Sequence, residues 1–378
     1  MSAPRFIGSE IYRASPFGPR HPLAIPRVST VTDLARALGW LPGGAYVTSP
    51  RARPAALTSF HTPEYVAALL AAEAEGAVTE AVRVRHGLGT LSNPVHGLMF
   101  RRPATSAGGA LLAAEMVRAG GVVMVPGAGT HHAFADRAGG FCYLNDPVLA
   151  LLHLRRLGLR RLAYVDIDAH HCDGVAAAFE GDRDLLLISV HEEDRWPRTG
   201  ALGDEGGGTH LNLPVPRGFN DTEMAAVRDG VILPGLEAFQ PEAVIVQCGA
   251  DAVEEDPLSR LALSNNAHVA AVLAIGAQTD RLIVTGGGGY NPWSVARCWT
   301  RVWGALTGQQ APERLEGAAR AVLEGLVWPG RSAGRNPPAA WSRTLADPPR
   351  EGPIRAEVAA RIAVVRDRLP GLRQRVWG

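Results

Sequence analysis

Five short apolar runs recur along the middle of the chain and alternate with segments of helical spacing. Each run is rich in Leu or β-branched residues and lacks strict alternation of apolar and polar positions. This pattern is typical of strands that are buried on both faces of a parallel sheet. The predicted strands are Val122–Val125, Leu162–Asp168, Leu185–His191, Ala243–Gly249 and Leu282–Gly286.

Amphipathic helices are predicted between these strands. One of them, Asn145–Leu157, has Pro147 near its start and Gly158 just past its end, as helix boundaries commonly do. The others are Thr105–Ala119, Asp221–Phe239 and Ser264–Ala277. This order of strands and helices indicates an α/β fold, doubly wound, with a mostly parallel sheet flanked by helices.

The two ends of the chain carry shorter patterns. We expect helices at Val31–Leu38 and Pro63–Glu75, a surface loop at Pro329–Pro353 and a final amphipathic helix at Glu357–Leu369. No internal repeat or linker is visible in the sequence. We therefore expect a single domain over residues 1–378, with a core at about 20–305 and a C-terminal surface extension at about 309–378.

Composition narrows the class of protein. Of the 378 residues, 46% are hydrophobic, and the formal net charge of +1 lacks the basic excess of a nucleic-acid-binding protein. No stretch reaches the ~18 apolar residues of a membrane span, and the first residues do not form a secretory signal. The four cysteines form no CxxC pair, which argues against a zinc finger or a disulfide framework. We expect a soluble cytoplasmic protein, and the bias towards Ala, Arg and Gly suggests a bacterial genome rich in GC.

Chemically reactive side chains gather where the predicted strands end. The carboxyl ends of parallel strands are the usual place for a binding or catalytic site. The residues at these ends are His131, His132, Asp166, Asp168, His170, His171, Ser189, His191, Asp251 and the segment Gly286–Tyr290. Their clustering predicts a pocket at that edge of the sheet.

A metal site is the first chemistry that these residues predict. Asp168 and His170 leave one strand end and Asp251 follows another, so the three can reach one ion. Zinc usually takes three protein ligands at a catalytic site and lowers the pKa of a water in the fourth position. The same donors would also accept iron(II), manganese or cobalt. The alternative is that these side chains cap helices or form ion pairs.

The pair His131–His132 suits general acid–base catalysis, because imidazole titrates near neutral pH. Asp166 and Asp173 are free to orient the two rings, although a surface pair of histidines is the alternative. The four glycines before Tyr290 let the backbone approach a ligand, and the tyrosine hydroxyl can donate to an oxyanion. A phosphate-binding loop would need a GxGxxG or Walker pattern that opens a helix, and this segment has neither.

Together these motifs resemble the signature blocks of the histone deacetylase family. The matching blocks, within about His21 to Trp299, are Gly129–Ala133, Gly139–Asp146, Asp166–Gly174, Gly249–Asp251 and Gly286–Tyr290. The segment Gly249–Ala252, followed by Asp256–Leu258, most resembles the bacterial acetoin-utilisation deacetylase branch of this family. The resemblance implies the arginase/deacetylase-like fold and a zinc-dependent deacetylase, a hydrolase that acts on linear amide bonds.

The resemblance also implies two kinds of metal ion. One zinc ion per chain would be held by Asp168, His170 and Asp251. A structural potassium ion would lie beside it, partly on backbone oxygens, at Asp166, Asp168, His170, Ser189 and Val190. Arginase-like ureohydrolases share this fold but need two manganese ions, with Asp where this chain has Cys172 and Val253. One catalytic metal ion is therefore expected.

The family's catalytic roles carry over onto matching positions. His132 would be the general base and then the general acid, oriented by Asp173, while His131 with Asp166 would add electrostatic support. Tyr290 would polarise the acetyl carbonyl.

The walls of the substrate tunnel follow in the same way. Phe141 would form one wall and Trp196 the other, and the Gly140 carbonyl would accept the substrate N–H. Leu258 would lie near the rim and offers no carboxylate to grip a distal amine.

Three positions depart from the family pattern. Cys172 stands where Gly is most common, and it should be tolerated if its side chain points away from the metal. Arg198 interrupts a Pro-Gly-Thr-Gly segment near the tunnel mouth. Asn93 lies near the position where many members have an Asp that grips the substrate backbone. The last two concern the substrate and not the chemistry.

The predicted function is removal of acetyl groups from N-acetyl-lysine of proteins or peptides by metal-activated water. One alternative is deacetylation of small acetylated amines such as polyamines, and another is a catalytically silent protein that binds acyl ligands. The acidic triplets Glu192–Asp194 and Glu254–Asp256 would attract a cationic substrate as a rim, or would simply be solvated loops. No nucleic-acid or membrane partner is expected, and an oligomer is compatible with the sequence.

Overall fold

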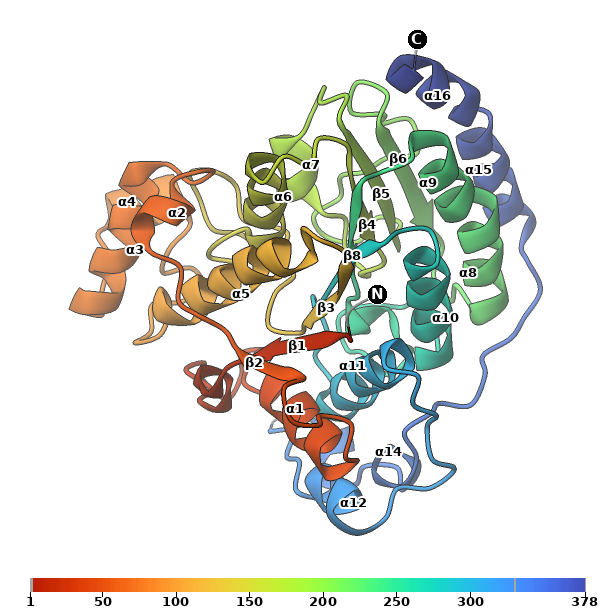
Figure 1. Ribbon diagram of the computed structural model, residues 1–378. Coiled ribbons are helices and arrows are strands. Elements are labelled where there is room, and N and C mark those ends of the chain that lie inside the picture. Colours follow the sequence, from red (N-terminus) through yellow and green to blue (C-terminus); the bar gives the residue numbers. More distant parts are fainter. Residues whose placement is uncertain (1–2, 330, 378) are drawn as a thin grey trace.

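One sheet of eight strands forms the centre of the protein, whose computed structural model describes residues 3–329 and 331–377 (Figure 1). The strands are β1 (Arg5–Gly8), β2 (Tyr46–Thr48), β3 (Gly121–Val125), β4 (Leu162–Asp166), β5 (Leu185–Glu192), β6 (His210–Val215), β7 (Ala243–Gln247) and β8 (Arg281–Thr285). Their order is β2-β1-β3-β8-β7-β4-β5-β6, and every described pairing is parallel. The predicted fold class is confirmed, with a wholly parallel sheet.

The five predicted strands are the contiguous inner strands β3, β8, β7, β4 and β5. The three strands that the sequence did not reveal lie towards the two edges. Strands β1 and β2 have four and three residues, too few for a recognisable apolar run. Strand β6 is an edge strand that contains His210, Asn212 and Pro214, and proline is tolerated in a strand mainly at such an edge.

Side chains of the inner strands alternate between two apolar clusters, one on each face of the sheet. In β4, Ala163 and Val165 belong to the first cluster, and Leu162 and Tyr164 belong to the second. Helices α5 (Arg101–Val117), α6 (Asp146–Arg156) and α7 (Asp173–Ala178) cover the second cluster. The first is covered by α1 (Val28–Ala37), α8 (Asp221–Val227), α9 (Leu233–Phe239), α10 (Asn265–Gly276) and α11 (Pro292–Leu306), on the opposite side in Figure 1.

The predicted helix Pro63–Glu75 is present with the same bounds, the other predicted helices have shifted ends, and one of them is interrupted. The expected helix Asp221–Phe239 contains a π-helical segment, Arg228–Ile232, between α8 and α9. Helix α11 was not predicted, although Asn291 caps it by accepting a hydrogen bond from Trp293 N at 3.0 Å. In the first hundred residues the predicted helix Pro63–Glu75 is α3, and it lies between two short helices that were not predicted, α2 (Pro54–Leu57) and α4 (Glu80–His86).

The C-terminal part packs against the first cluster. It forms α12 (Gly317–Glu324), α13 (Ser332–Arg335), α14 (Ala340–Arg343), α15 (Ala356–Arg366) and α16 (Leu369–Trp377), and two of these lie within the predicted loop Pro329–Pro353. Buried Trp341 and Val358 belong to the first cluster, and a buried ion pair joins Asp347 to Arg297 of α11 at 2.6 Å. None of the helices in the described ranges is long and apolar enough to span a bilayer.

Candidate active site

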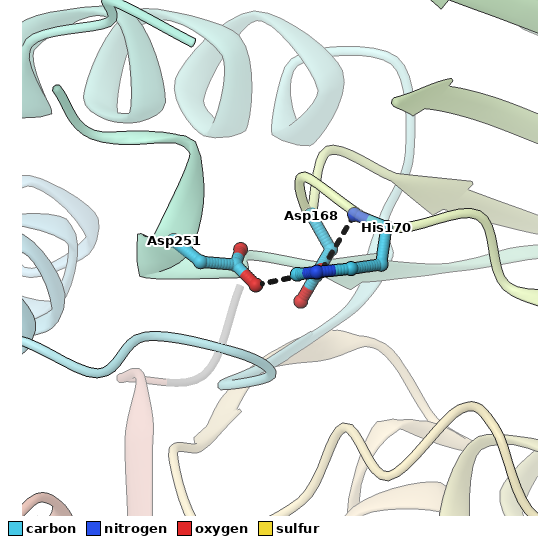
Figure 2. A group of neighbouring side chains, drawn as sticks. All are labelled: Asp168, His170 and Asp251. Carbon is cyan, nitrogen blue, oxygen red and sulfur yellow. Dashed lines mark hydrogen bonds and ion pairs between the residues drawn. The ribbon is translucent and has the colours of Figure 1, made fainter. Parts of the chain in front are cut away.

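The predicted site residues meet at the carboxyl edge of the sheet. The chain leaving β4 carries Asp168 and His170, and the chain leaving β7 makes one helical turn that carries Asp251. Strands β4 and β7 are adjacent in register, so these two loops lie side by side. Figure 2 shows the three side chains pointing at one another from these loops.

Asp168, His170 and Asp251 form a compact group of metal-binding type. They are buried, and one donor atom from each lies within 4.8 Å of the others. His170 Nδ1 is 2.9 Å from Asp251 Oδ2 and 3.2 Å from Asp168 Oδ1. Within the described ranges no other group of this kind occurs. The carboxylates are fixed by backbone N–H groups, because Gly288 N donates to Asp168 Oδ2 at 2.7 Å and Ala169 N donates to Asp251 Oδ1 at 3.0 Å.

The charges of this group suit a divalent cation. Burial alone would lower the pKa of His170, but hydrogen bonds and charge from the two carboxylates outweigh it and raise this pKa to about 10. The negative field that stabilises a proton there also attracts a metal ion, and one imidazole nitrogen with carboxylate oxygens is a donor set that zinc accepts. The residues present therefore fit a single divalent ion.

Two glycines make room for the carboxylates. A Cβ at Gly288 would lie 2.0 Å from Asp251 Oδ2, and a Cβ at Gly249 would lie 2.2 Å from Asp168 Oδ2. Real Cβ contacts are never so short, so any larger residue would displace a carboxylate. The glycine segment before Tyr290 therefore leaves room for the carboxylate of Asp251, and the predicted approach of these glycines to a ligand stays a prediction.

His131 and His132 lie beside the Asp168–His170–Asp251 group, and their pKa values are shifted in opposite directions. His131 Nδ1 is 2.8 Å from Asp166 Oδ2, and His132 Nδ1 is 2.7 Å from Asp173 Oδ1. Burial opposes charge on His131, but the neighbouring carboxylates prevail and raise its pKa to about 9. For His132, burial and the adjacent His131 lower the pKa to about 4. These shifts favour the charged form of His131 and the neutral, basic form of His132.

A cavity of about 110 Å³ lies against these histidines. Its lining includes Gly140, Phe141 and Tyr290, and the Phe141 and Tyr290 rings meet edge to face at 5.7 Å. Trp196, which is 48% exposed, lies at 4.6 Å from the His132 ring. Leu258 is not among the residues that line the cavity, and its described polar contact is a backbone N–H to Asp256.

Tyr290 is a buried donor that a neighbouring carboxylate holds in place. Burial raises its pKa well above the ordinary value, so the hydroxyl stays protonated. Its backbone N–H donates to Asp256 Oδ2 at 2.6 Å. The sequence placed Asp256 in a possible acidic rim and did not predict this contact with Tyr290. Its signal was indirect, since it begins the Asp256–Leu258 segment.

The loop that carries His131 and His132 is held by hydrogen bonds with Asn145 and Asp146, to which the sequence assigned no function. Asp146 accepts hydrogen bonds from Gly129 N at 2.6 Å and from Ser106 Oγ at 2.7 Å. Asn145 Nδ2 donates to the backbone oxygens of His131 and Ala133. In the sequence, the only indication of this supporting role is that Asn145 and Asp146 are polar residues at the start of a predicted helix and lie within the block Gly139–Asp146.

A second buried amide supports the same loop from the sheet. Gln247, at the end of β7, donates from Nε2 to Gly129 O at 2.8 Å and accepts from Thr285 Oγ1 at 3.0 Å. In the sequence, this role is indicated only by the position of Gln247, a polar residue at the end of the apolar run that begins at Ala243.

The three residues that depart from the family pattern, Asn93, Cys172 and Arg198, lie in different environments. Asn93 is buried, and its Nδ2 donates to Cys142 O at 3.2 Å, so it supports the cavity wall. Cys172 is buried in the second apolar cluster and is not part of the metal-binding group. Arg198 is exposed, with a φ of 65°.

The all-parallel sheet and the Asp–His–Asp group define an arginase/deacetylase-like α/β protein. A family profile of the histone deacetylase domain matches residues 21–306. The acetoin utilization protein AcuC of Bacillus subtilis is 32% identical over 317 residues, which are 80% of this chain and 82% of that protein. Histone deacetylase 2 of Oryza sativa is 34% identical over 308 residues, 79% of this chain and 60% of that protein.

Solved structures agree with this relationship. The structure of an HDAC homologue from Aquifex aeolicus has a TM-score of 0.91 and 33% identity, and the match covers 97% of this chain and 100% of that one. This chain belongs to the histone deacetylase family, and it is an enzyme of the class that hydrolyses amide bonds.

Proposed function

We propose that this protein is a zinc-dependent deacetylase that removes acetyl groups from N-acetyl-lysine side chains of proteins or peptides. The observation that carries this proposal is the closeness of the Asp168–His170–Asp251 group to His132, which lines the cavity and whose ring centroid lies 6.1 Å from that of His170. The relatives named for histone deacetylation support the same substrate class. Small acetylated amines are the second candidate substrates.

Zinc would be held by Asp168, His170 and Asp251, and when bound it would lower the pKa of a water and polarise the acetyl carbonyl. His132 Nε2 takes the proton from the attacking water, because Asp173 occupies Nδ1 at 2.7 Å. A C–O bond forms at the acetyl carbon, and the C–N bond then breaks as His132 returns the proton to the amine nitrogen. The products are acetate and a free lysine.

The neighbouring side chains stabilise this change of charge. The Tyr290 hydroxyl donates to the carbonyl oxygen as it becomes an oxyanion, and charged His131, held by Asp166, offsets the negative charge nearby. Phe141 and Trp196 would flank the methylene chain of the substrate. The Gly140 carbonyl would accept the substrate N–H.

A structural potassium ion is part of the proposal. Its ligands would be Asp166, Asp168, His170, Ser189 and Val190. The pairing of Asp166 with Ser189 across strands β4 and β5 brings the two halves of this set together.

The test is hydrolysis of an acetyl-lysine peptide and of an acetylated polyamine side by side. We expect the peptide to be cleaved by the zinc-loaded protein, and the Tyr290→Phe variant to lose about 10²- to 10³-fold in kcat, as for loss of one oxyanion donor. Cleavage of the polyamine alone would move the substrate to the small amines. Cleavage of neither by the zinc-loaded protein would favour a silent acyl-binding protein.

A further inference from the structure

A second pocket, here called the rim pocket, shares Tyr290 with the active-site cavity. Its wall includes Arg20, His21, Pro257, Tyr290, Trp328 and Arg331. A group bound in it would therefore lie next to the acetyl-lysine that the catalytic tyrosine contacts. Apart from Tyr290, the residues of this wall take no part in the proposed reaction.

The rim pocket carries two positive charges without a counterion. Arg20 and Arg331 are exposed, and neither has an ion pair with a carboxylate in the described part of the chain. No Asp or Glu is among the described residues that line the pocket. His21 is neutral, because its Nδ1 accepts from Leu23 N, its Nε2 is bonded to Ser92 O, and burial lowers its pKa.

An aromatic wall supports one of the two arginines. The Arg331 guanidinium lies 6.0 Å from the Trp328 ring centroid, within the range of a cation–π contact. Trp328 is buried and meets both Trp293 and Trp341 at 6.4 Å. The wall is therefore a packed part of the protein, and both Trp328 and Arg331 lie beyond residue 306, where the family match ends.

The acidic triplets that the sequence offered as an acidic rim do not offset these charges. Asp256 is buried on backbone N–H groups. Ion pairs take up four more carboxylates, as Glu192–Arg195, Glu193–Arg361, Glu254–Arg350 and Glu255–Arg350. The sixth, Asp194, is exposed and lines a different pocket that also contains Arg198. A cationic substrate would thus meet unpaired arginines at this side of the site, with few free carboxylates to attract it.

We infer that the rim pocket binds a carboxylate side chain of the substrate polypeptide beside the acetyl-lysine. The enzyme therefore selects acetyl-lysines with a neighbouring Glu or Asp, and it disfavours polyamines and strongly basic tails. A guanidinium pairs with a carboxylate through two parallel hydrogen bonds, and two arginines at one pocket offer this geometry twice. This inference rests on the proposed deacetylase function and adds the sequence preference of the same site.

The experiment compares matched acetyl-lysine peptides that carry Glu, Gln or Lys at each of the two positions before and after the acetyl-lysine. Wild-type enzyme, the double variant Arg20→Gln/Arg331→Gln and the control Arg118→Gln are assayed for kcat and KM. Arg118 is also exposed, but it precedes the amino end of β3, away from the carboxyl edge of the sheet. Free Nε-acetyl-lysine and its amide are compared in the same assay.

We expect wild type to favour the best Glu peptide over its Gln counterpart by about three- to tenfold, mainly in KM, as for partly exposed charge pairs. The preference should fall below about twofold in the double variant and in 0.5 M salt, with kcat on the Gln peptide unchanged. The control should keep the wild-type preference. Fluorescence anisotropy with labelled peptides gives the same comparison without turnover.

Three results would overturn the inference: equal use of Glu and Gln peptides by wild type, a preference that survives in the double variant, or a preference for Lys. A carboxylate preference confined to free Nε-acetyl-lysine would overturn the assignment to a polypeptide. If the peptides bind with the expected preference but none is cleaved by zinc-loaded enzyme, the proposed function fails while the pocket assignment stands.

Discussion

The hydrogen bond between Asp173 and His132 offers a sharp test of the acid–base assignment. Asp173 Oδ1 lies 2.7 Å from His132 Nδ1 and also accepts from Gly174 N at 3.0 Å. Asn at this position keeps the shape and can still accept both hydrogen bonds, but it removes the negative charge. The substitution Asp173→Asn therefore acts on the protonated form of His132 and leaves the fold in place.

The size of the effect follows from the charge that is lost. A hydrogen bond to a charged group contributes about 1.5–3 kcal/mol, and outer partners of catalytic groups typically contribute a factor of about 10 to 100. We expect kcat for an acetyl-lysine peptide to fall about 10- to 100-fold. KM should change less than about threefold, because Asp173 is not among the residues that line the cavity.

The assay is steady-state hydrolysis at pH 7.5 with metal content measured on the same samples. The matched control is Glu115→Gln, which alters an exposed carboxylate that lies 3.2 Å from His153. The control should keep kcat within about twofold of wild type. A kcat for Asp173→Asn within twofold of wild type, at equal metal content, would refute the role given to His132.

Three further predictions follow from other contacts. Gly288→Ala should reduce zinc affinity at least tenfold by equilibrium dialysis, because its Cβ would lie 2.0 Å from Asp251 Oδ2. Burial lowers the pKa of His61 to about 4, so the free energy of unfolding should fall as the pH drops from about 6.5 to 4. In urea unfolding, this fall should be smaller by about 3 kcal/mol in His61→Gln than in wild type. Asp347→Ala should cost about 3–5 kcal/mol in urea unfolding, because Arg297 is left buried and unpaired.

Each of these predictions has its own control. Gly203→Ala places a Cβ where no atom lies within 4 Å, so its zinc affinity should match wild type. Stability falls with falling pH because the pKa of His61 is lower in the folded chain than in the unfolded chain, where it is about 6.5. As the pH falls, the unfolded chain binds the proton first and is stabilised relative to the folded chain. An unchanged pH slope for His61→Gln would contradict this. The double variant Arg297→Leu/Asp347→Ala should be more stable than Asp347→Ala, and equal stability would contradict the ion-pair argument.

The inner sheet was predictable because burial on both faces leaves continuous apolar runs, whereas the edge strands were not. Strand β6 carries His210, Asn212 and Pro214, and β2 has only three residues, so neither stands out in the sequence. Helix α11 escaped notice because its Asn–Pro start resembles a turn. Its cap is visible only once Asn291 is seen to accept from Trp293 N.

The grouping of Asp168, His170 and Asp251 was predictable from position, because these residues follow strands whose carboxyl ends share an edge. The supports of the site were harder to predict, because they act across large sequence separations. Gln247 reaches Gly129 over 118 positions, and no local pattern shows which turn a buried amide will meet. The rim pocket is hidden in the same way, since Arg20 and Arg331 meet only in the fold.

The central claim is that one bound metal ion at the Asp168–His170–Asp251 group makes the protein an amide hydrolase. The most direct measurement is acetate release from an acetyl-lysine peptide while zinc is titrated into metal-stripped enzyme. We predict that the rate rises from near zero and reaches a plateau at one zinc per chain. Turnover by the metal-free protein, or no turnover with one zinc bound, would contradict the claim.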